Sequence, residues 1–339
     1  MQEQEEQRFE PSGTRERNLA MELVRVTEAA TLSAGRWMGK GNKEMVDQSA
    51  VDAMRQALDV VEMNGVVVIG EGEKDEAPML YIGEQVGNGS PPDVDVAVDP
   101  VDGTRLLSLG LPGALAVVAT AERGTMYSAP PGVFYMEKIA VGPAMRNVID
   151  INAPVAVNLD RIARARDSHI DDLTVIILDR PRHAEIIKQI RQVGARIRLI
   201  TDGDVSAAIQ AAMEDYTGVD VLMGIGGAPE AVLAAAAIKC IGGEIQCKIW
   251  PRDDKERERF KSEGIDVNQV FRTDDLVRGN DVSFAATGIT SGELVDGVQY
   301  FGWGARTSSV MMRSHSGTVR YIHARHKWRK NGRMGIPRP

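Results

Sequence analysis

The sequence predicts an α/β protein of layered α+β type that is built from two domains. Its 339 residues are more than one ordinary hydrophobic core accommodates. Up to about residue 155, two helical patterns precede several short strand patterns, whereas strand and helix patterns alternate beyond it. We therefore expect an N-terminal α+β domain over residues 18–155 and a C-terminal α/β domain over residues 156–326. A disordered leader (1–17) and a basic flexible tail (327–339) are expected to flank them.

The N-terminal domain is expected to begin with two helices. Apolar residues recur every three or four positions over residues 19–37, and Gly39 and Gly41 end that run. Asp47 is expected to cap a second helix, whose apolar face extends to Val61. Runs of β-branched or alternating apolar residues then predict strands at residues 66–69, 94–98, 114–120 and 133–141.

The C-terminal domain is expected to contain a parallel sheet covered by helices, because strand and helix patterns alternate there. The predicted strands are residues 174–178, 197–200 and 219–223, and the predicted helices are 183–193, 205–213 and 230–240. Ligands of parallel sheets bind beyond the carboxyl ends of the strands, where three polar loops lie, at residues 179–183, 201–204 and 224–230. Further strands are predicted at residues 281–286, 299–303 and 318–323.

The formal net charge of −8 is concentrated in one stretch of the chain. Between Glu71 and Asp102 lie nine acids and one base, so this stretch alone has the net charge of the whole chain. That distribution argues against general nucleic-acid binding. The opposite pattern, seven Lys and Arg residues without an acid, extends from Arg320 to Arg338. It is the one stretch that favours nucleic acid, although an oligomer contact or the framing of an anionic substrate explains it equally.

Cysteine content and hydropathy indicate the compartment. Cys240 and Cys247 are too few for a disulfide framework and indicate a reducing environment. No apolar run approaches the roughly 20 residues of a membrane helix, and the first residues lack the apolar core of a signal peptide. We therefore expect a cytoplasmic protein with no membrane contact.

Carboxylates at two strand ends form the most informative pattern. Residues 99–104 (DPVDGT) end an apolar strand and place Asp99 and Asp102 in one turn before Gly103 and Thr104. Carboxylate and carbonyl oxygens in a turn suit a hard divalent cation, but an Asx-turn closing the strand is the alternative. Glu71 ends another strand between glycines. Such grouped carboxylates repel one another unless a cation is bound, although a solvated acidic loop also explains Glu71.

The polar loops of the C-terminal domain offer groups for an anion and for hydroxyls. Arg180 and Arg182, two positions apart after a strand, can face one anion, or they can be ordinary surface charge. Asp202 and Asp204 flank a glycine and can accept hydrogen bonds from sugar hydroxyls, or they can cap a turn. His183 follows the arginines and is expected at the surface.

The glycine-rich loop at residues 224–230 allows a different interpretation. It can be read as a nucleotide loop, which with the basic tail describes a non-catalytic nucleotide- or nucleic-acid-binding regulator. A lone glycine-rich loop is weak evidence, however, and this one does not follow the first strand of its domain. Pro229 and Glu230 equally suit the first turn of a helix, where proline is favoured and an acid interacts well with the helix dipole.

Taken in order, these motifs resemble those of the class II fructose-1,6-bisphosphatases, which belong to the lithium-sensitive, metal-dependent sugar phosphatases. The resemblance covers about residues 18–325 and is carried by residues 47, 70–84, 99–104, 135–138, 180–183, 202–205 and 224–230. It implies a fold of alternating α-β-α-β-α layers with two sheet domains. It also implies hydrolysis of the 1-phosphate of fructose-1,6-bisphosphate to fructose 6-phosphate and phosphate, in gluconeogenesis or a sugar-phosphate cycle. A bifunctional enzyme that also accepts sedoheptulose-1,7-bisphosphate, as in cyanobacteria, is the nearest alternative. An inositol monophosphatase-like or nucleotide 3′-phosphatase is the next.

The resemblance also implies roles for individual residues. Two or more Mn²⁺ or Mg²⁺ ions would be held by Asp47, Glu71, Asp99, Asp102 and Glu230. Thr104, Asp47 and Lys43 would take part in catalysis. The substrate would contact Asp102, Gly103, Thr104, Tyr135, Arg180, Pro181, Arg182, Asp202, Gly203, Asp204 and Gly227. Some members carry Glu in place of Asp102, so the shorter side chain here changes the reach of one ligand. The family implies a homo-oligomer, either a dimer or a tetramer.

Overall fold

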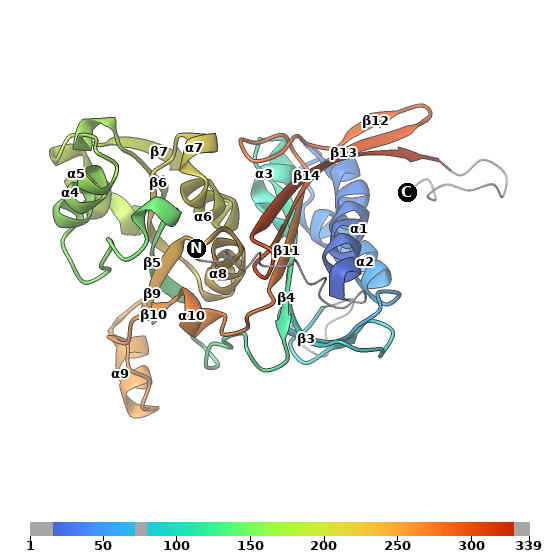
Figure 1. The fold of residues 1–339 in the computed structure, drawn as a ribbon, viewed down its shortest axis with the longest axis horizontal. Helices are drawn as coiled ribbons and strands as arrows, with labels where there is room; N and C mark the ends of the chain where they lie inside the picture. Colours follow the sequence, from blue (N-terminus) through green and yellow to red (C-terminus); the bar gives the residue numbers. More distant parts are fainter. Residues whose placement is uncertain (1–15, 72–79, 329–339) are drawn as a thin grey trace, which may run out of the picture.

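The computed structural model, which describes residues 16–71 and 80–328, has two sheets and three layers of helices (Figure 1). Helices α1 (Glu16–Ala34) and α2 (Lys43–Leu58) cover the outer face of the first sheet. Helices α6 (Asp204–Ala212) and α8 (Ala228–Ile241) lie between the sheets. The outer face of the second sheet is covered by α4 (Val155–Ala165) and α5 (Ala184–Gln192). The predicted α/β layered fold is therefore confirmed.

The first sheet is mixed and has eight strands. β1 (Asn64–Ile69) runs parallel to β3 (Asp93–Asp102), which pairs antiparallel with β4 (Leu115–Glu122). The sheet continues through β11 (Ser283–Gly288) to β13 (Gly304–Arg313). The remaining strands are β2 (Gln85–Val86), β12 (Gln299–Phe301) and β14 (Thr318–Lys327). Short helix α3 (Thr104–Leu109) follows β3 directly.

The second sheet has the strand order β10-β9-β5-β8-β6-β7. β6 (Thr174–Leu178) is parallel to β7 (Arg196–Ile200) and β8 (Val221–Gly227), as predicted. The sheet as a whole is mixed, however, because β5 (Tyr135–Val141) runs antiparallel to β8 and to β9 (Glu244–Ile249), so the prediction of a parallel sheet holds for only part of it. Antiparallel neighbours need no crossover helix, so strand–helix alternation does not reveal them. The smaller elements around this sheet are α7 (Glu214–Thr217), α9 (Asp254–Ser262), β10 (Phe271–Arg272) and α10 (Thr273–Leu276).

The two sheets do not follow the predicted boundary near residue 155. β5 precedes that boundary but belongs to the second sheet, and β11 to β14 come after it but return to the first. The division into domains at residues 18–155 and 156–326 stays a prediction. Of the predicted leader and tail, only residues 16–17 and 327–328 are among the described residues.

Local chemistry explains where the first helices begin and end. The Asn42 side chain caps α2 by accepting a hydrogen bond from the Met45 N–H at 3.0 Å. The expectation that Asp47 is the cap is therefore wrong: Asp47 lies within the helix, one turn beyond its start. After α1, Gly35 opens a short 3₁₀ turn, where a Cβ atom would lie 2.5 Å from the Tyr300 hydroxyl. Only glycine lets β12 approach so closely.

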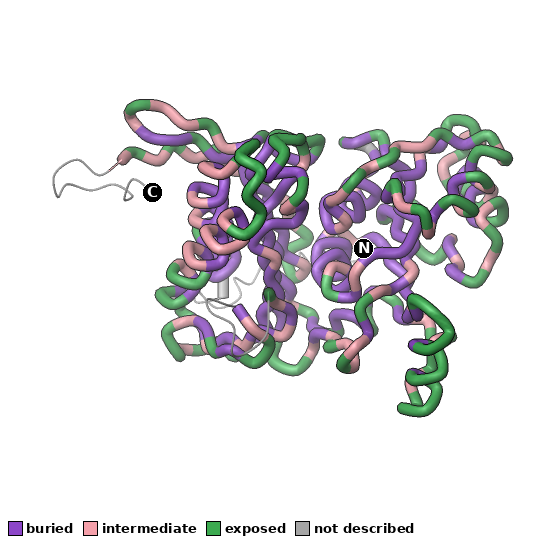
Figure 2. The backbone as a smooth tube through the Cα atoms, turned by 180° about the vertical axis from the view of Figure 1, so that it is seen from behind, coloured by how far each residue is buried: buried purple, intermediate pink, exposed green. Residues whose placement is uncertain are grey.

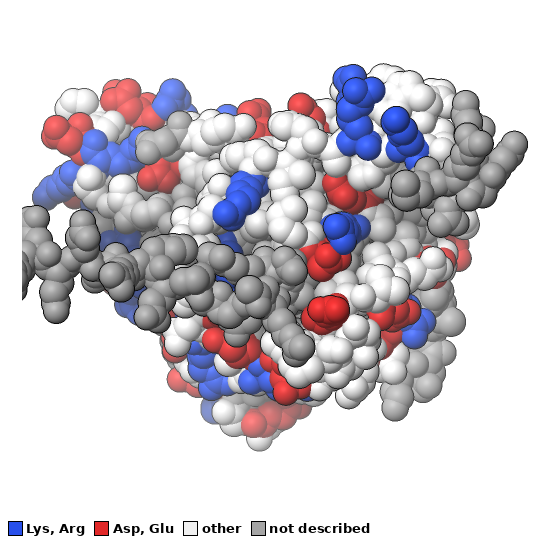
Figure 3. All heavy atoms as spheres, turned by 45° about the vertical axis from the view of Figure 1, so that its right-hand side comes forward, with Lys and Arg blue, Asp and Glu red and all other residues white. Residues whose placement is uncertain are grey.

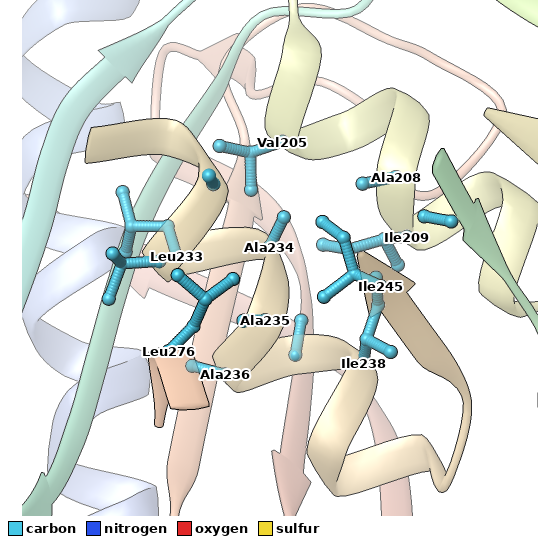
Figure 4. Packing of buried hydrophobic residues seen from close by; sticks show 14 of the residues in the cluster. Val205, Ala208, Ile209, Leu233, Ala234, Ala235, Ala236, Ile238, Ile245 and Leu276 are labelled. Carbon is cyan, nitrogen blue, oxygen red and sulfur yellow. The ribbon is translucent and has the colours of Figure 1, made fainter. Parts of the chain in front are cut away.

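The central layer is packed with small side chains. Figure 4 shows Val205 and Ala208 of α6 facing the alanines of α8, with Ile245 of β9 and Leu276 beside them. A helix that is apolar on all sides is buried on all sides, and α8 is such a helix. Figure 2 shows the buried chain concentrated in these central layers, whereas α9 is largely exposed. Within the described part of the chain, no helix is long and apolar enough to span a membrane.

Candidate active site

The end of β3 forms the centre of the candidate site. Its pairing with β4 shifts register between Asp99 and Asp102, where Pro100 cannot donate to a neighbouring strand. Gly103 then adopts a φ of +95°, which favours glycine, and Thr104 begins α3. The Val101 N–H donates to Asp99 Oδ1 at 3.0 Å, so the Asx-turn considered for this motif is present. The turn leaves both carboxylates at the same strand end.

Thr104 links this turn to α2. Its hydroxyl donates to Asp47 Oδ1 at 2.7 Å and also approaches the Val101 carbonyl oxygen at 3.3 Å. Desolvation raises the pKa of Asp47, while the Thr104 hydrogen bond and the charge of Lys43 oppose that rise. Lys43, the first residue of α2, is exposed. The structure thus brings the three predicted catalytic residues together.

Two further carboxylates at this strand end are strongly perturbed. Desolvation and then the charges of Asp102 and Glu71 raise the pKa of Asp99 well above its usual value. Desolvation also raises the pKa of Asp102 well above its usual value, although the Ser206 N–H at the start of α6 donates to Asp102 Oδ2 at 3.2 Å. Among the described residues, the charges that act on Asp99 and Asp102 are those of other acids.

Glu71 and Glu230 complete the predicted set of acids. Glu71 lies two residues beyond the end of β1, and desolvation, then the charges of Asp47 and Glu230, raise its pKa. Glu230 lies in the first turn of α8, and a Cβ atom on Gly227 would overlap its carboxylate. Desolvation raises the pKa of Glu230, opposed mainly by Lys138. Its buried Oε2 atom has no hydrogen-bond partner among residues 16–71 and 80–328.

The chemistry of these side chains fits a hard divalent cation, which prefers oxygen ligands. An orphaned carboxylate oxygen at Glu230 and the mutual repulsion of the acids are what a bound cation would relieve. Among the described residues, however, no three His, Cys, Asp or Glu side chains converge into a ready-made metal-binding group. Neighbouring residues Glu73, Asp75 and Glu76 lie outside the described residues.

A cavity of about 410 Å³ joins the acids to the predicted substrate residues. Arg182 is held there by two hydrogen bonds from its guanidinium to the Ile225 carbonyl oxygen, at 2.8 and 3.2 Å, and lies 5.2 Å from the Tyr135 ring. Burial lowers the pKa of Arg182, and the positive charge of Arg180 lowers it further. The residues that line the cavity include Asp102, Tyr135, Arg180, Arg182, Asp202, Asp204, Gly227 and Glu230. Acids and guanidinium groups thus share one cavity.

The loop before α6 joins the cavity to the carboxylate turn. Gly203 has a φ of +89°, and a Cβ atom there would lie 4.0 Å from Asp102 Oδ2. Asp204 is the first residue of α6 and forms an ion pair with Lys138. Pro181 begins a short 3₁₀ turn between the two arginines.

A larger cavity of about 630 Å³ lies on the other side of the Asp202–Gly203 loop. Leu106, Leu199 and Arg198 are among the residues that line it. Its lining includes Asp202 but contains neither Asp102 nor Glu230. We therefore assign the chemistry to the smaller cavity.

Two residues near the site differ from what the sequence predicted. His183 is buried, not at the surface: Nδ1 contacts the Leu178 carbonyl oxygen at 2.7 Å, and Nε2 accepts from the Ile225 N–H at 2.7 Å. The contact with Ile225 connects the loop that carries Arg180 and Arg182 to β8. Lys138 is 2% exposed, and the sequence alone predicted no role for it. The signal that could have identified it is a lysine within a largely apolar strand. Such a lysine is expected to be buried and therefore to need an acidic partner.

Comparison with known proteins defines the class to which this fold and site belong. Residues 17–326 match the family model described as bacterial fructose-1,6-bisphosphatase, glpX-encoded. The chain therefore belongs to this fructose-1,6-bisphosphatase family, which confirms the predicted resemblance and the prediction of a phosphoric monoester hydrolase.

Individual relatives agree with that assignment. The chain is 43% identical over 333 residues to a D-fructose 1,6-bisphosphatase class 2/sedoheptulose 1,7-bisphosphatase of Synechococcus sp. (strain JA-3-3Ab), covering 91% of this chain and 95% of the relative. It is 44% identical over 323 residues to a fructose-1,6-bisphosphatase class 2 of Haemophilus influenzae, covering 91% of this chain and 96% of the relative.

Proposed function

We propose that this protein hydrolyses the 1-phosphate of fructose-1,6-bisphosphate to give fructose 6-phosphate and phosphate, in gluconeogenesis or a sugar-phosphate cycle. The observation that carries the proposal is the hydrogen bond from Thr104 to Asp47 beside the carboxylate turn. Asp102 of that turn lines the same cavity as Arg180 and Arg182. A bisphosphate needs such an arrangement, because one phosphate is cleaved while the other is only held.

The proposed cofactor is Mn²⁺ or Mg²⁺, with two or more ions held by Asp47, Glu71, Asp99, Asp102 and Glu230. Divalent ions at this position would lower the pKa of a water molecule and neutralise charge on the phosphate and the leaving oxygen. The orphaned Glu230 Oε2 and the raised pKa values of Asp99 and Asp102 support this proposal.

Thr104 and Asp47 are proposed to move the proton of the attacking water. The hydroxyl of Thr104 already donates to Asp47, so its oxygen can accept a proton from a water on its other side. Lys43 would contribute positive charge near the scissile phosphate, since it lies one turn from Asp47. Gly103 supports Thr104 by permitting the left-handed turn that starts α3.

The second phosphate and the sugar are proposed to occupy the cavity between the sheets. Within the described residues, the hydrogen bond of the Arg180 side chain is a long one, 3.5 Å to the Asp179 carbonyl oxygen, so Arg180 can pair with a phosphate. Tyr135, Arg182 and Gly227 would also contact the substrate in this cavity. Pro181 would fix the conformation of the loop that carries Arg180 and Arg182. Asp202 and Asp204, which line the same cavity, can accept hydrogen bonds from sugar hydroxyls, and Gly203 keeps that loop close to Asp102.

A bifunctional enzyme that also cleaves sedoheptulose-1,7-bisphosphate is the second candidate. The specific support is the relative from Synechococcus, whose name includes that substrate. Release of phosphate from fructose-1,6-bisphosphate, sedoheptulose-1,7-bisphosphate and inositol monophosphate, each with Mn²⁺, Mg²⁺ or a chelator, tests these functions together. Activity on inositol monophosphate alone would reject the sugar-bisphosphate assignment, and undiminished activity with chelator would reject the metal.

The proposed setting is a cytoplasmic homo-oligomer, a dimer or a tetramer, that binds no nucleic acid. Cys240 and Cys247 are buried free thiols, and desolvation raises the pKa of each to about 12, which suits a reducing compartment. Exposed Leu111 and Leu199 at the larger cavity offer apolar surface for a subunit contact. Acidic and basic side chains are interspersed on the face drawn in Figure 3, which does not favour a polyanion. Light scattering would measure the subunit number.

A further inference from the structure

Lys138 is a buried cation beside the candidate site. It lies in β5, opposite Gly224 of β8 and Cys247 of β9, and its side chain is 1% exposed. A buried ammonium is costly unless it is paired with a negative charge. Its Nζ forms an ion pair and hydrogen bond with Asp204 Oδ2. The partner is therefore a residue that lines the substrate cavity.

The surrounding backbone leaves just enough space for this pair. A Cβ atom on Gly226 would overlap the Asp204 carboxylate and would lie 3.0 Å from Lys138 Nζ. Gly226 also lines the cavity, so the ion pair lies directly against the space proposed for the sugar. Glycine at this position thus permits the contact between β5 and the start of α6.

The surrounding charges favour the charged form of Lys138. Burial alone lowers the pKa of the Lys138 ammonium, but Asp204 and then Glu230 outweigh that effect, and its pKa is raised. Lys138 in turn opposes the rise in the pKa of Glu230. No other lysine of the described residues is paired with an acid that lines this cavity.

We propose that Lys138 is a positioning residue for the substrate: it holds Asp204 by Oδ2 so that Oδ1 is presented to a sugar hydroxyl. The hydrogen bonds found among the described residues do not use Oδ1 of Asp204. A buried ion pair is weak evidence of a contribution to stability, since apolar side chains of similar volume often stabilise as well. Asp204 lines the cavity together with Arg180 and Arg182, which gives the pair a role in binding. This inference rests on the proposed function.

A double-mutant cycle tests the proposal in the full-length enzyme. The variants are Lys138→Met, Asp204→Asn and the double variant, with Lys138→Gln as a variant that retains a donor for Asp204. Lys248→Met is the matched control, because Lys248 of the neighbouring strand β9 is paired with Glu137 at 3.5 Å and does not line the cavity. KM and kcat for fructose-1,6-bisphosphate are measured together with the calorimetric Kd of fructose 6-phosphate, which requires no turnover.

Loss of a charge-assisted contact predicts that Lys138→Met raises KM and the Kd of fructose 6-phosphate by about tenfold or more, with kcat changed less than about threefold. In the Asp204→Asn background the same substitution should raise them by less than about twofold, because its effect passes through Asp204. Lys138→Gln should recover part of the affinity, and Lys248→Met should leave both constants unchanged.

The outcomes separate this inference from the proposed function. Unchanged KM and Kd in a folded Lys138→Met enzyme, or fully additive effects in the double variant, would overturn the positioning role while leaving the phosphatase assignment intact. If Lys138→Met does not fold, Lys138→Gln and the double variant, which removes both charges, decide the question. A wild-type enzyme that cleaves no sugar bisphosphate and binds no fructose 6-phosphate would instead remove the proposed function, and the inference with it.

Discussion

Replacing Thr104 by valine removes the hydroxyl of the proposed proton path while nearly preserving side-chain volume. The hydroxyl donates to Asp47 Oδ1 at 2.7 Å, a length typical of a strong hydrogen bond to a carboxylate. A positioned proton-transfer group contributes roughly 10²–10⁴-fold to a rate. We therefore expect kcat to fall on the order of 10²-fold, which corresponds to about 2.7 kcal/mol of transition-state stabilisation.

The assay is phosphate release from saturating fructose-1,6-bisphosphate with Mn²⁺, beside calorimetric titration of Mn²⁺ into the same variant. Thr104→Ser is the matched control, because it keeps the hydroxyl and should retain most of the activity. A Thr104→Val enzyme with full turnover and unchanged metal binding would refute the proton path. A loss of Mn²⁺ binding equal to the loss of activity would instead assign Thr104 to the structure of the metal site.

Three other properties can be tested directly. Millimolar Mn²⁺ or Mg²⁺ should raise the Tm, because a cation bound to the folded acids stabilises the native state, and no rise would argue against a metal site there. His183 should make the protein less stable in acid: burial lowers its pKa below 6.5, so its contribution is complete above that pH and is lost as the pH falls toward the lowered value. Urea unfolding should therefore show a steeper loss of stability from pH 6.5 downward in the wild type than in His183→Gln, and equal slopes would contradict this. Arg180→Met should raise KM for the bisphosphate by about tenfold with little change in kcat, and a lower kcat at unchanged KM would show that Arg180 acts on the scissile phosphate instead.

Much of the candidate site was visible in the sequence because its signals are local. Asp99, Asp102 and Thr104 are close together in the chain, and an apolar strand leads directly into them. Only the family resemblance assigned Thr104 and Asp47 to catalysis together, since 57 residues separate the two. Strand and helix patterns likewise predicted β6, β7, α6 and α8, where apolar runs and glycines alternate clearly.

Elements with mixed side chains were not predicted. β9 contains Gln246 and Lys248 among its apolar residues, and α9 has charged side chains on most of its surface, so neither shows a clean period. The order of strands was also hidden, because β5 and β9 pair antiparallel within a sheet whose other signals are parallel. Asn42 and not Asp47 is the helix cap, because the Asn42 side chain faces the Met45 N–H.

The sequence by itself determined the layered α/β class, the positions of most strands and helices, and the carboxylates that end β1 and β3. Periodicity indicates which face of an element is apolar, and an acid in a turn can be recognised from the neighbouring residues whatever the tertiary arrangement. Only the tertiary structure decided that Lys138 is paired with Asp204, 66 residues away, and that His183 is buried between two backbone groups. Such contacts depend on which layers face each other, and a local pattern contains no information about the partner that covers it.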